Sequence, residues 1–251
     1  MKKTLPILTL MLILGCHGDA RPPVLLIASD ATFAPFHLID DSGVATGFDI
    51  ELARAVAKHA GFEPEVVVLK YADLFSGLLA GTHDVVAATT GITAERQKTY
   101  RFSAPYFTTC QVAVVRTGSG EPQTITELKG KRIGASGAGT SAQAMQMIDG
   151  IHVQLNDGEG VTSLLANAID AWIVDEFDAV AAARKSNDRL RALADGIANE
   201  QYGFVLALDR QDLQARINAS LASLENDGVV AQLQARFGVE RGPTWPVQCH
   251  D

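Results

Sequence analysis

An alternation of short apolar runs with amphipathic stretches, repeated along the chain, is the feature that most constrains its fold. Residues 24–28, 65–69 and 84–88 have the apolar composition of buried strands. Residues 48–57 and 73–79, which lie between them, have helical spacing, and a glycine follows each. A strand–helix–strand–helix–strand order predicts a parallel sheet with right-handed crossovers.

A second unit of the same kind follows a Gly- and Pro-rich crossing at residues 117–122. The order of motifs is repeated, because the strand from Asp84 ends at Thr89 and the strand from Asp170 ends at Asp175. The sequence therefore predicts two similar α/β lobes. The other expected strands are residues 111–116, 131–136, 151–155, 171–174 and 202–208, and the other expected helices are residues 142–148, 160–168, 179–184, 213–225 and 229–237.

Length and composition limit the classes of function. A chain of 251 residues suits one large domain or two modest lobes. The net charge is −8, and no run of Lys and Arg interleaves with aromatic residues, so nucleic acid is not an expected partner. The six histidines are scattered and no Cys-x-x-Cys occurs, so we expect no structural metal site.

The first residues indicate export. Lys2 and Lys3 precede an apolar run at residues 5–14, which has the length of a signal-peptide core and is too short to span a bilayer. The run leads into Ile-Leu-Gly-Cys, ending at Cys16, which resembles the lipobox of bacterial lipoproteins. Cys16 is therefore a candidate for lipidation, with an ordinary signal peptide as the alternative. In either case we expect a periplasmic protein or one anchored by lipid to the bacterial membrane.

Two further cysteines can pair if Cys16 carries lipid. Export permits disulfides, and Cys110 and Cys249 are the cysteines that remain. We therefore hypothesise a Cys110–Cys249 bridge that ties the C-terminal tail to the middle of the chain.

The stretch from Thr89 to Arg96 follows an expected strand, and ligands of open α/β sheets bind beyond the carboxyl ends of strands. Thr93 stands where a helix N-cap is expected, so residues 94–96 would form a first helical turn. Free N–H groups, hydroxyls and the Arg96 guanidinium together suit a carboxylate. The alternative is a capped surface helix with Arg96 in solvent.

The glycine loop at residues 137–141 leaves three interpretations open. It fits a dinucleotide fingerprint that ends in alanine, with Asp157 about twenty residues further on. It also fits a helix N-terminus that binds a small carboxylate with hydroxyls from Thr140 and Ser141, or a plain turn. A triphosphate loop is excluded, because Thr140 stands where that loop needs lysine.

Three motifs carry a resemblance to a known family. In order they are GFDIELA at residues 47–53, GITAER at residues 91–96 and FSAPY at residues 102–106. They resemble the family 3 extracellular solute-binding proteins, the periplasmic amino-acid receptors of ABC importers. The resemblance implies two α/β lobes of the Venus-flytrap type, like type II periplasmic binding proteins, joined by a two-strand hinge. Residues 1–16 would be the signal or lipobox segment, residues 22–111 with 204–251 the first lobe, and residues 112–203 the second.

The resemblance also implies how a free amino acid is held at its charged ends. Arg96 looks like the arginine that grips the ligand α-carboxylate, and Thr140 and Ser141 look like the second-lobe donors to it. Asp175 looks like the acid that binds the α-ammonium, and Thr89 falls where a backbone carbonyl or hydroxyl touches that ammonium.

The same resemblance implies which residues surround the ligand side chain, and this chain differs from the family pattern at two places. Asp30 looks like the first-lobe acid, and Phe33 and Tyr71 fall at the aromatic positions around the ligand side chain, so a polar or basic amino acid is expected. Gly91 stands where many relatives carry Ser or Thr, so only its backbone N–H can serve. The glycine loop is one residue longer than usual, which puts the register of Thr140 and Ser141 in question.

We therefore expect a monomeric binding protein that uses no cofactor and delivers an L-amino acid to the membrane subunits of an ABC importer. The alternative is an enzyme on the same fold, similar to the cyclohexadienyl or arogenate dehydratases. It would need a general acid in the cleft. Glu176 and His37 are the candidates, although we expect Glu176 on the surface.

Overall fold

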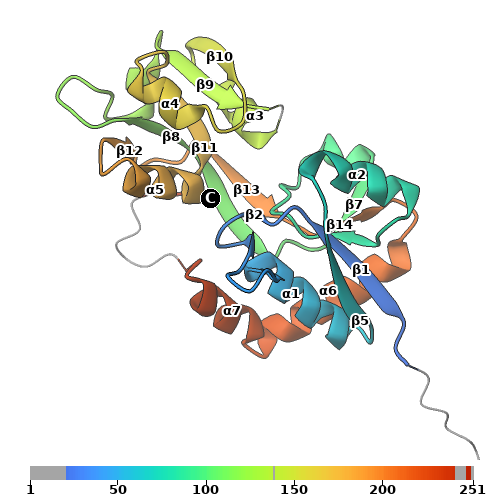
Figure 1. Cartoon of the computed structure of the whole chain (residues 1–251). Helices are drawn as coiled ribbons and strands as arrows, with labels where there is room; N and C mark the ends of the chain where they lie inside the picture. The colour runs from blue at the N-terminus through green and yellow to red at the C-terminus, as the bar shows by residue number, and fades with distance from the viewer. Residues whose placement is uncertain (1–20, 138, 241–246, 250–251) are drawn as a thin grey trace, which may run out of the picture.

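The chain folds into two lobes, each built around its own β-sheet (Figure 1). The computed structural model describes residues 21–137, 139–240 and 247–249. The expectation of two α/β lobes joined by a two-strand hinge is confirmed. The division expected from the sequence placed residues 1–16 in an export segment, and this segment, with Cys16, lies outside the described residues.

The first lobe has a five-stranded sheet in the order β5-β1-β6-β14-β7. Strand β1 pairs in parallel with β5 and β6, whereas β14 pairs antiparallel with β6 and β7. A small antiparallel sheet of β2, β3 and β4, which the sequence did not indicate, follows β1. The bounds are β1 Val24–Ser29, β2 Thr32–Phe33, β3 His37–Ile39, β4 Ala45–Thr46, α1 Phe48–His59, β5 Glu63–Val68, α2 Tyr71–Ala80, β6 Val85–Val86, β7 Tyr100–Phe102, β14 Val205–Ala207, α6 Gln211–Asn226 and α7 Val229–Phe237.

Alternating side chains of this sheet divide the lobe into two apolar layers, as the period of a strand requires. Leu25 and Ile27 of β1 pack in the layer that contains α1 and α6. Ala28 of the same strand packs on the other face with Leu74 and Leu78 of α2. Helices α1 and α2 therefore cover opposite faces of the sheet (Figure 1).

The second lobe has a six-stranded sheet with the path β10-β9-β11-β8-β12, and β13 pairs with β8. Helix α3 covers one face, and α4 and α5 cover the other. The bounds are β8 Phe107–Arg116, η2 Ile125–Leu128, β9 Arg132–Ser136, α3 Thr140–Met145, β10 Ile151–Leu155, α4 Gly160–Leu165, β11 Ala171–Asp175, α5 Glu176–Lys185, β12 Leu190–Ala192 and β13 Ala198–Tyr202.

Strands β8 and β13 run between the lobes and form the hinge (Figure 1). They pair antiparallel from Phe107 opposite Tyr202 to Gln111 opposite Ala198. The expectation of one strand over residues 202–208 is corrected, because the chain pairs with β8 as β13 and then with β6 and β7 as β14. Side chains of both hinge strands are thereby placed at the junction of the lobes.

The helix expected to begin at Thr93 is reduced to a single turn, η1 Arg96–Lys98. The Thr93 hydroxyl accepts from the Arg96 N–H at 3.2 Å, and the Thr93 carbonyl accepts from the Gln97 N–H at 3.0 Å. The chain then enters β7 at Tyr100 and pairs with β14, which ends the turn. The prediction of a capped turn was therefore right and the prediction of a helix was wrong.

The C-terminal tail joins the second lobe. A disulfide links Cys110 of β8 to Cys249, with 5.7 Å between their Cα atoms. Gln248 forms a parallel bridge with Asp195, and Val247 packs in the core of the second lobe. The expected first lobe included residues 204–251, but these tail residues depart from that division. None of the helices in the described ranges is long and apolar enough to cross a membrane.

Candidate functional site: the cleft between the lobes

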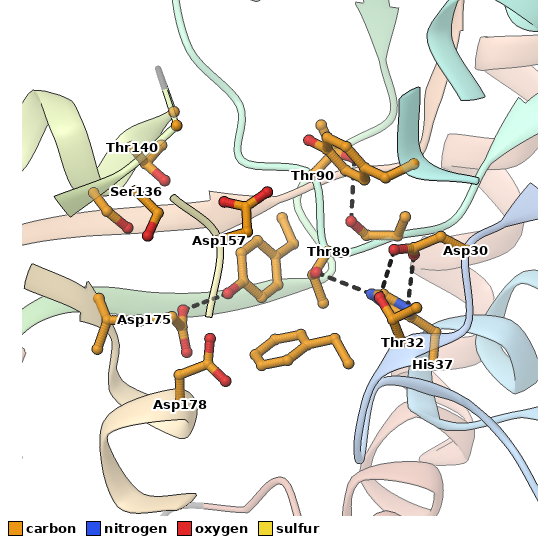
Figure 2. A pocket seen from close by; sticks show the side chains of 18 of the residues that line it. Asp30, Thr32, His37, Thr89, Thr90, Ser136, Thr140, Asp157, Asp175 and Asp178 are labelled. Carbon is orange, nitrogen blue, oxygen red and sulfur yellow. Dashed lines mark hydrogen bonds and ion pairs between the residues drawn. The ribbon is translucent and has the colours of Figure 1, made fainter. Parts of the chain in front are cut away.

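A cleft of about 1320 Å³ opens between the lobes. Figure 2 shows Asp30, Thr32, His37, Thr89 and Thr90 of the first lobe facing Thr140, Asp157, Asp175 and Asp178 of the second. Of the nine ligand-site residues expected from the sequence, eight line this cleft, and Gly91 is the exception. Gly91 borders the cleft, because its carbonyl accepts a hydrogen bond from Arg96 and its Cα faces Glu200 and Thr140, which line the cleft.

Two of the three motifs that carry the family resemblance, GFDIELA and FSAPY, meet at one buried carboxylate. Asp49 of α1 accepts a hydrogen bond from the Thr89 N–H at 2.6 Å and another from the Tyr106 hydroxyl at 2.7 Å. Burial raises the pKa of Asp49 to about 6, although the nearby His37 and these two donors oppose the rise. Gly47 starts the helix that carries Asp49, and any side chain there would overlap the Phe36 backbone. The first and third motifs are thus coupled to each other, and Asp49 also holds Thr89, which lies between β6 and the second motif.

Thr89 has a left-handed backbone with φ of 41°, which is rare for a β-branched residue. Its N–H is taken by Asp49, and its hydroxyl lies 3.2 Å from Nε2 of His37. Nδ1 of the same imidazole lies 3.1 Å from the Asp30 carboxylate, which also accepts from Thr32 at 2.5 Å. Burial acts to raise the pKa of Asp30, but His37 and Thr32 outweigh it and leave this pKa below the usual value. Asp30 therefore stays ionised at the cleft wall.

Arg96 enters the cleft from the turn that Thr93 caps. One guanidinium nitrogen donates to the Gly91 carbonyl at 2.9 Å. Its other terminal nitrogen lies 3.7 Å from the point that a Cβ on Gly139 would occupy. The guanidinium thus faces the start of α3 across the cleft. Such a pairing of a planar cation with a helix N-terminus from the other lobe suits a carboxylate.

Thr140 and Ser141 begin α3, but they play different parts. The Ser141 hydroxyl donates to the side-chain carbonyl of Gln111 at 2.7 Å. The Thr140 hydroxyl lies 3.5 Å from the Gln111 amide nitrogen and also contacts Glu200. The second-lobe hydroxyls are therefore organised by the hinge strands before any ligand arrives.

Asp175 ends β11 and caps α5. Its carboxylate accepts from the Phe177 N–H at 2.8 Å, from the Thr109 hydroxyl at 3.0 Å and from the Tyr202 hydroxyl. Burial raises the pKa of Asp175 to about 8, with repulsion from Glu200 adding to the rise and the three donors opposing it. An incoming cationic group would favour the ionised form and lower this pKa.

The rest of the cleft is acidic and partly aromatic. Five acids line its walls, namely Asp30, Asp157, Asp175, Asp178 and Glu200. The lining residues include two with cationic side chains of the Lys or Arg type, Lys70 and Arg96. Burial raises the pKa of Asp178 to about 6. Phe33 stacks on Phe36 with 5.4 Å between ring centroids, and Tyr71 is half exposed at the start of α2. This surplus of acids suits a ligand with positive charge.

Sequence reasoning missed the residues that the hinge contributes. Gln111, Glu200 and Tyr202 line the cleft, but no motif marks them, because their positions follow from the pairing of β8 with β13.

The expectation that Glu176 lies on the surface was wrong. Glu176 is fully buried, accepts from the Thr109 hydroxyl at 2.9 Å and lies outside the cleft lining, whereas His37 lines the cleft.

A metal site finds no support among these groups. The set of His, Cys, Asp and Glu ligand atoms that lie close together in the described ranges is Cys110, Glu176 and Cys249. The two cysteines are joined in the disulfide, so they offer no thiolate to a metal.

Two α/β lobes on a two-strand hinge, with a polar cleft between them, define a protein of the two-lobed solute-binding class. The sequence pattern of the bacterial extracellular solute-binding proteins, family 3, matches residues 25–240, and the chain belongs to this family. The expected family resemblance is thereby confirmed.

Two of the relatives that this chain resembles are named as binding proteins. The chain is 32% identical over 222 residues to the L-cystine-binding protein TcyJ of Escherichia coli strain K12, covering 86% of this chain and 83% of the relative. It is 27% identical over 220 residues to the arginine-binding extracellular protein ArtP of Bacillus subtilis strain 168, covering 85% of each.

Solved structures give the same result for the fold. The arginine-, lysine-, histidine-binding protein ArtJ of Geobacillus stearothermophilus aligns with a TM-score of 0.75 and 29% identity, covering 87% of this chain and 96% of that one. An ancestral arginine-binding protein bound to glutamine aligns with a TM-score of 0.73 and 30% identity, covering 86% of this chain and 98% of that one.

Proposed function

We propose that this protein binds a free L-amino acid with a polar or basic side chain outside the cytoplasm and delivers it to an ABC importer. The observation that carries the proposal is the placing of a guanidinium and a carboxyl group that a ligand ammonium can ionise on opposite walls of one cleft. Arg96 faces the start of α3, and Asp175 lies on the second lobe. A zwitterion is recognised by such a pair, and each charge-assisted hydrogen bond contributes about 1.5–3 kcal/mol when water is excluded.

In this proposal the α-carboxylate of the ligand lies between Arg96 and Thr140, and the α-ammonium lies at Asp175. The Thr89 carbonyl or hydroxyl contacts the ammonium. If the hydroxyl does so, it contacts both the ammonium and the His37 imidazole. The side chain of the ligand extends between Phe33 and Tyr71. The acid surplus of the cleft, with Asp30 held ionised, favours a basic side chain in that space. Binding proteins for arginine and for cystine among the relatives support this ligand class.

The partners and the location form part of the same proposal. The importer's membrane subunits would receive the ligand from a monomer of this protein, held outside the cytoplasm by lipid on Cys16. Mass spectrometry of the natively expressed protein tests the anchor. An unmodified N-terminus after signal cleavage would rule out lipidation of Cys16.

Replacing Arg96 by Ala tests the role of the carboxylate grip. We expect Arg96→Ala to weaken amino-acid binding at least about 100-fold in titration calorimetry, because about 2.7 kcal/mol or more of charge-assisted bonding is lost. The circular dichroism spectrum should be unchanged. Lys98→Ala is the matched control, because it removes an exposed cation from the same turn without touching the cleft. Unchanged affinity in Arg96→Ala would overturn the assignment.

A further inference from the structure

A buried glutamate occupies the part of the cleft where the carboxylate-binding donors converge. Glu200 belongs to the hinge strand β13 and is 8% exposed. Its carboxylate accepts from the Gln111 side-chain amide at 2.5 Å and from the Thr140 hydroxyl. Arg96 attracts it from the first lobe. The site that would receive a ligand carboxylate therefore already contains one from the protein.

The missing side chain of residue 91 makes room for this glutamate. A Cβ built on Gly91 would overlap Oε1 of Glu200 and would come within 3.1 Å of the Thr140 methyl group. Gly91 has no need of a left-handed backbone, so its lack of a side chain is a matter of space. Residue 91 and Glu200 are thus alternatives for one volume, and this chain fills that volume with a carboxylate in place of a first-lobe hydroxyl.

Charged and titratable groups on several neighbouring elements interact with Glu200. Arg96 is the cation that attracts it, and Asp175 is an acid that repels it, while the phenols of Tyr71 and Tyr202 are near enough to feel its charge. Burial raises the pKa of Glu200, and the bonds from Gln111 and Thr140 and the Arg96 charge oppose this only in part. One guanidinium cannot balance two carboxylates in a closed cleft, and a proton on one of them relieves the repulsion.

We propose that Glu200 determines how the carboxylate end of the cleft works: it fills the space left by Gly91, and it takes up a proton when the ligand carboxylate arrives at Arg96. The protonated Glu200 then donates a hydrogen bond within the same cluster, so the ligand has Arg96 to itself. This inference rests on the proposed function, because it needs a ligand carboxylate at Arg96.

Because Asp175 also exchanges a proton when a ligand binds, the proton uptake of Glu200 must be measured by comparing wild type with Glu200→Gln. A ligand ammonium at Asp175 drives a proton off that carboxyl, whose pKa is about 8 in the empty cleft. The wild-type protein can therefore show almost no net proton exchange, since release at one acid offsets uptake at the other. The difference between wild type and Glu200→Gln isolates the proton that Glu200 takes up.

The test is titration calorimetry with L-arginine, L-glutamine and L-cystine as probes, at pH 6.5 in phosphate and in imidazole buffer. The dependence of the heat on buffer ionisation gives the protons exchanged for each probe that binds. We expect Glu200→Gln to take up fewer protons than wild type, by up to about one. The ratio of its affinity to that of wild type should rise by up to about tenfold per pH unit between pH 6 and 7.5. Glu225→Gln is the control, because it makes the same charge change on the exposed side of α6.

A second pair of variants tests the shared volume. Gly91→Ala should lose at least about tenfold in affinity, and adding Glu200→Ala should recover most of that loss, because the overlap is then removed. Equal proton counts in wild type and Glu200→Gln, a constant affinity ratio over pH, or no recovery in the double variant would overturn the inference. Failure of wild type to bind the three probes and every other polar or basic L-amino acid at any pH would instead overturn the proposed function.

Discussion

Asp175 combines a buried position with a ring of three donors, and this makes the empty cleft sensitive to pH. With the pKa of Asp175 raised to about 8, its contribution to stability is fully present below the ordinary value of 3.8. That contribution is lost as the pH rises through about 8, because the ionised carboxylate is then buried without a cation. A bound ligand ammonium supplies the cation, so ligand should restore stability most strongly at high pH.

We therefore predict that Asp175→Asn reduces the dependence of stability on pH. In urea unfolding without ligand, the free energy of unfolding of wild type should fall between pH 5 and 8, by up to about 1.4 kcal/mol per pH unit from this group. Asp175→Asn should be flatter over that range and should bind amino acids more weakly. Asp157→Asn, which alters an exposed acid of the same cleft, is the control. Parallel profiles for wild type and Asp175→Asn would contradict the assignment.

Single residues show how far sequence reasoning can reach. Arg96 and Asp175 were predicted to share a site because the family resemblance implies it, and the structure places both in the cleft. Glu200 could not be predicted, because its position depends on the absence of a side chain at Gly91 and on pairing across the hinge. The partners of Asp30 were missed for a similar reason, since His37 reaches it through a small sheet that has no apolar signature.

At the scale of elements, local patterns were reliable where one face of a helix or both faces of a strand are buried. Helix α1 was expected over residues 48–57 and is observed as Phe48–His59. The strand β13 was missed because exposed and buried residues alternate in a polar sequence, Ala-Asn-Glu-Gln-Tyr, that reads as loop. Its identity as a strand comes from its long-range pairing with β8, which no local pattern contains.

The disulfide between β8 and the tail gives a prediction at this scale. It closes a loop with a sequence separation of 139 residues, and a loop of that size contributes about 2–5 kcal/mol through the unfolded state. Replacing Cys110 and Cys249 together by Ala should lower the free energy of unfolding in urea by this amount. Amino-acid affinity should change little, because neither cysteine lines the cleft. Two titratable thiols in the unreduced mature protein would argue against the bond.

At the scale of the whole molecule, the ligand groups are divided between bodies that a hinge connects. Arg96 and Thr89 belong to the first lobe, whereas Thr140 and Asp175 belong to the second. A ligand held by both bodies favours the closed arrangement by its differential affinity for that arrangement. The same division makes the ligand a stabiliser of the folded state as a whole.

We predict that L-arginine, or another amino acid that binds, reduces the radius of gyration in small-angle X-ray scattering and raises the melting temperature. At a ligand concentration of about 100 times Kd, the added stability is about 2.7 kcal/mol, which corresponds to about 5–10 °C for a chain of this size. Arg96→Ala at the same ligand concentration should show neither change. Stabilisation without compaction would mean that the ligand binds to one lobe alone.

The tail bond has a consequence for how widely the molecule can open. Helix α7 packs on the first lobe and ends at Phe237, whereas Val247 is anchored in the second lobe beside Cys249. Residues 240 and 247 are separated by seven peptide units, and seven units span at most about 25 Å. The chain thus connects the two lobes a third time. Its length limits how far residues 240 and 247 can separate when the lobes open, however flexible β8 and β13 are.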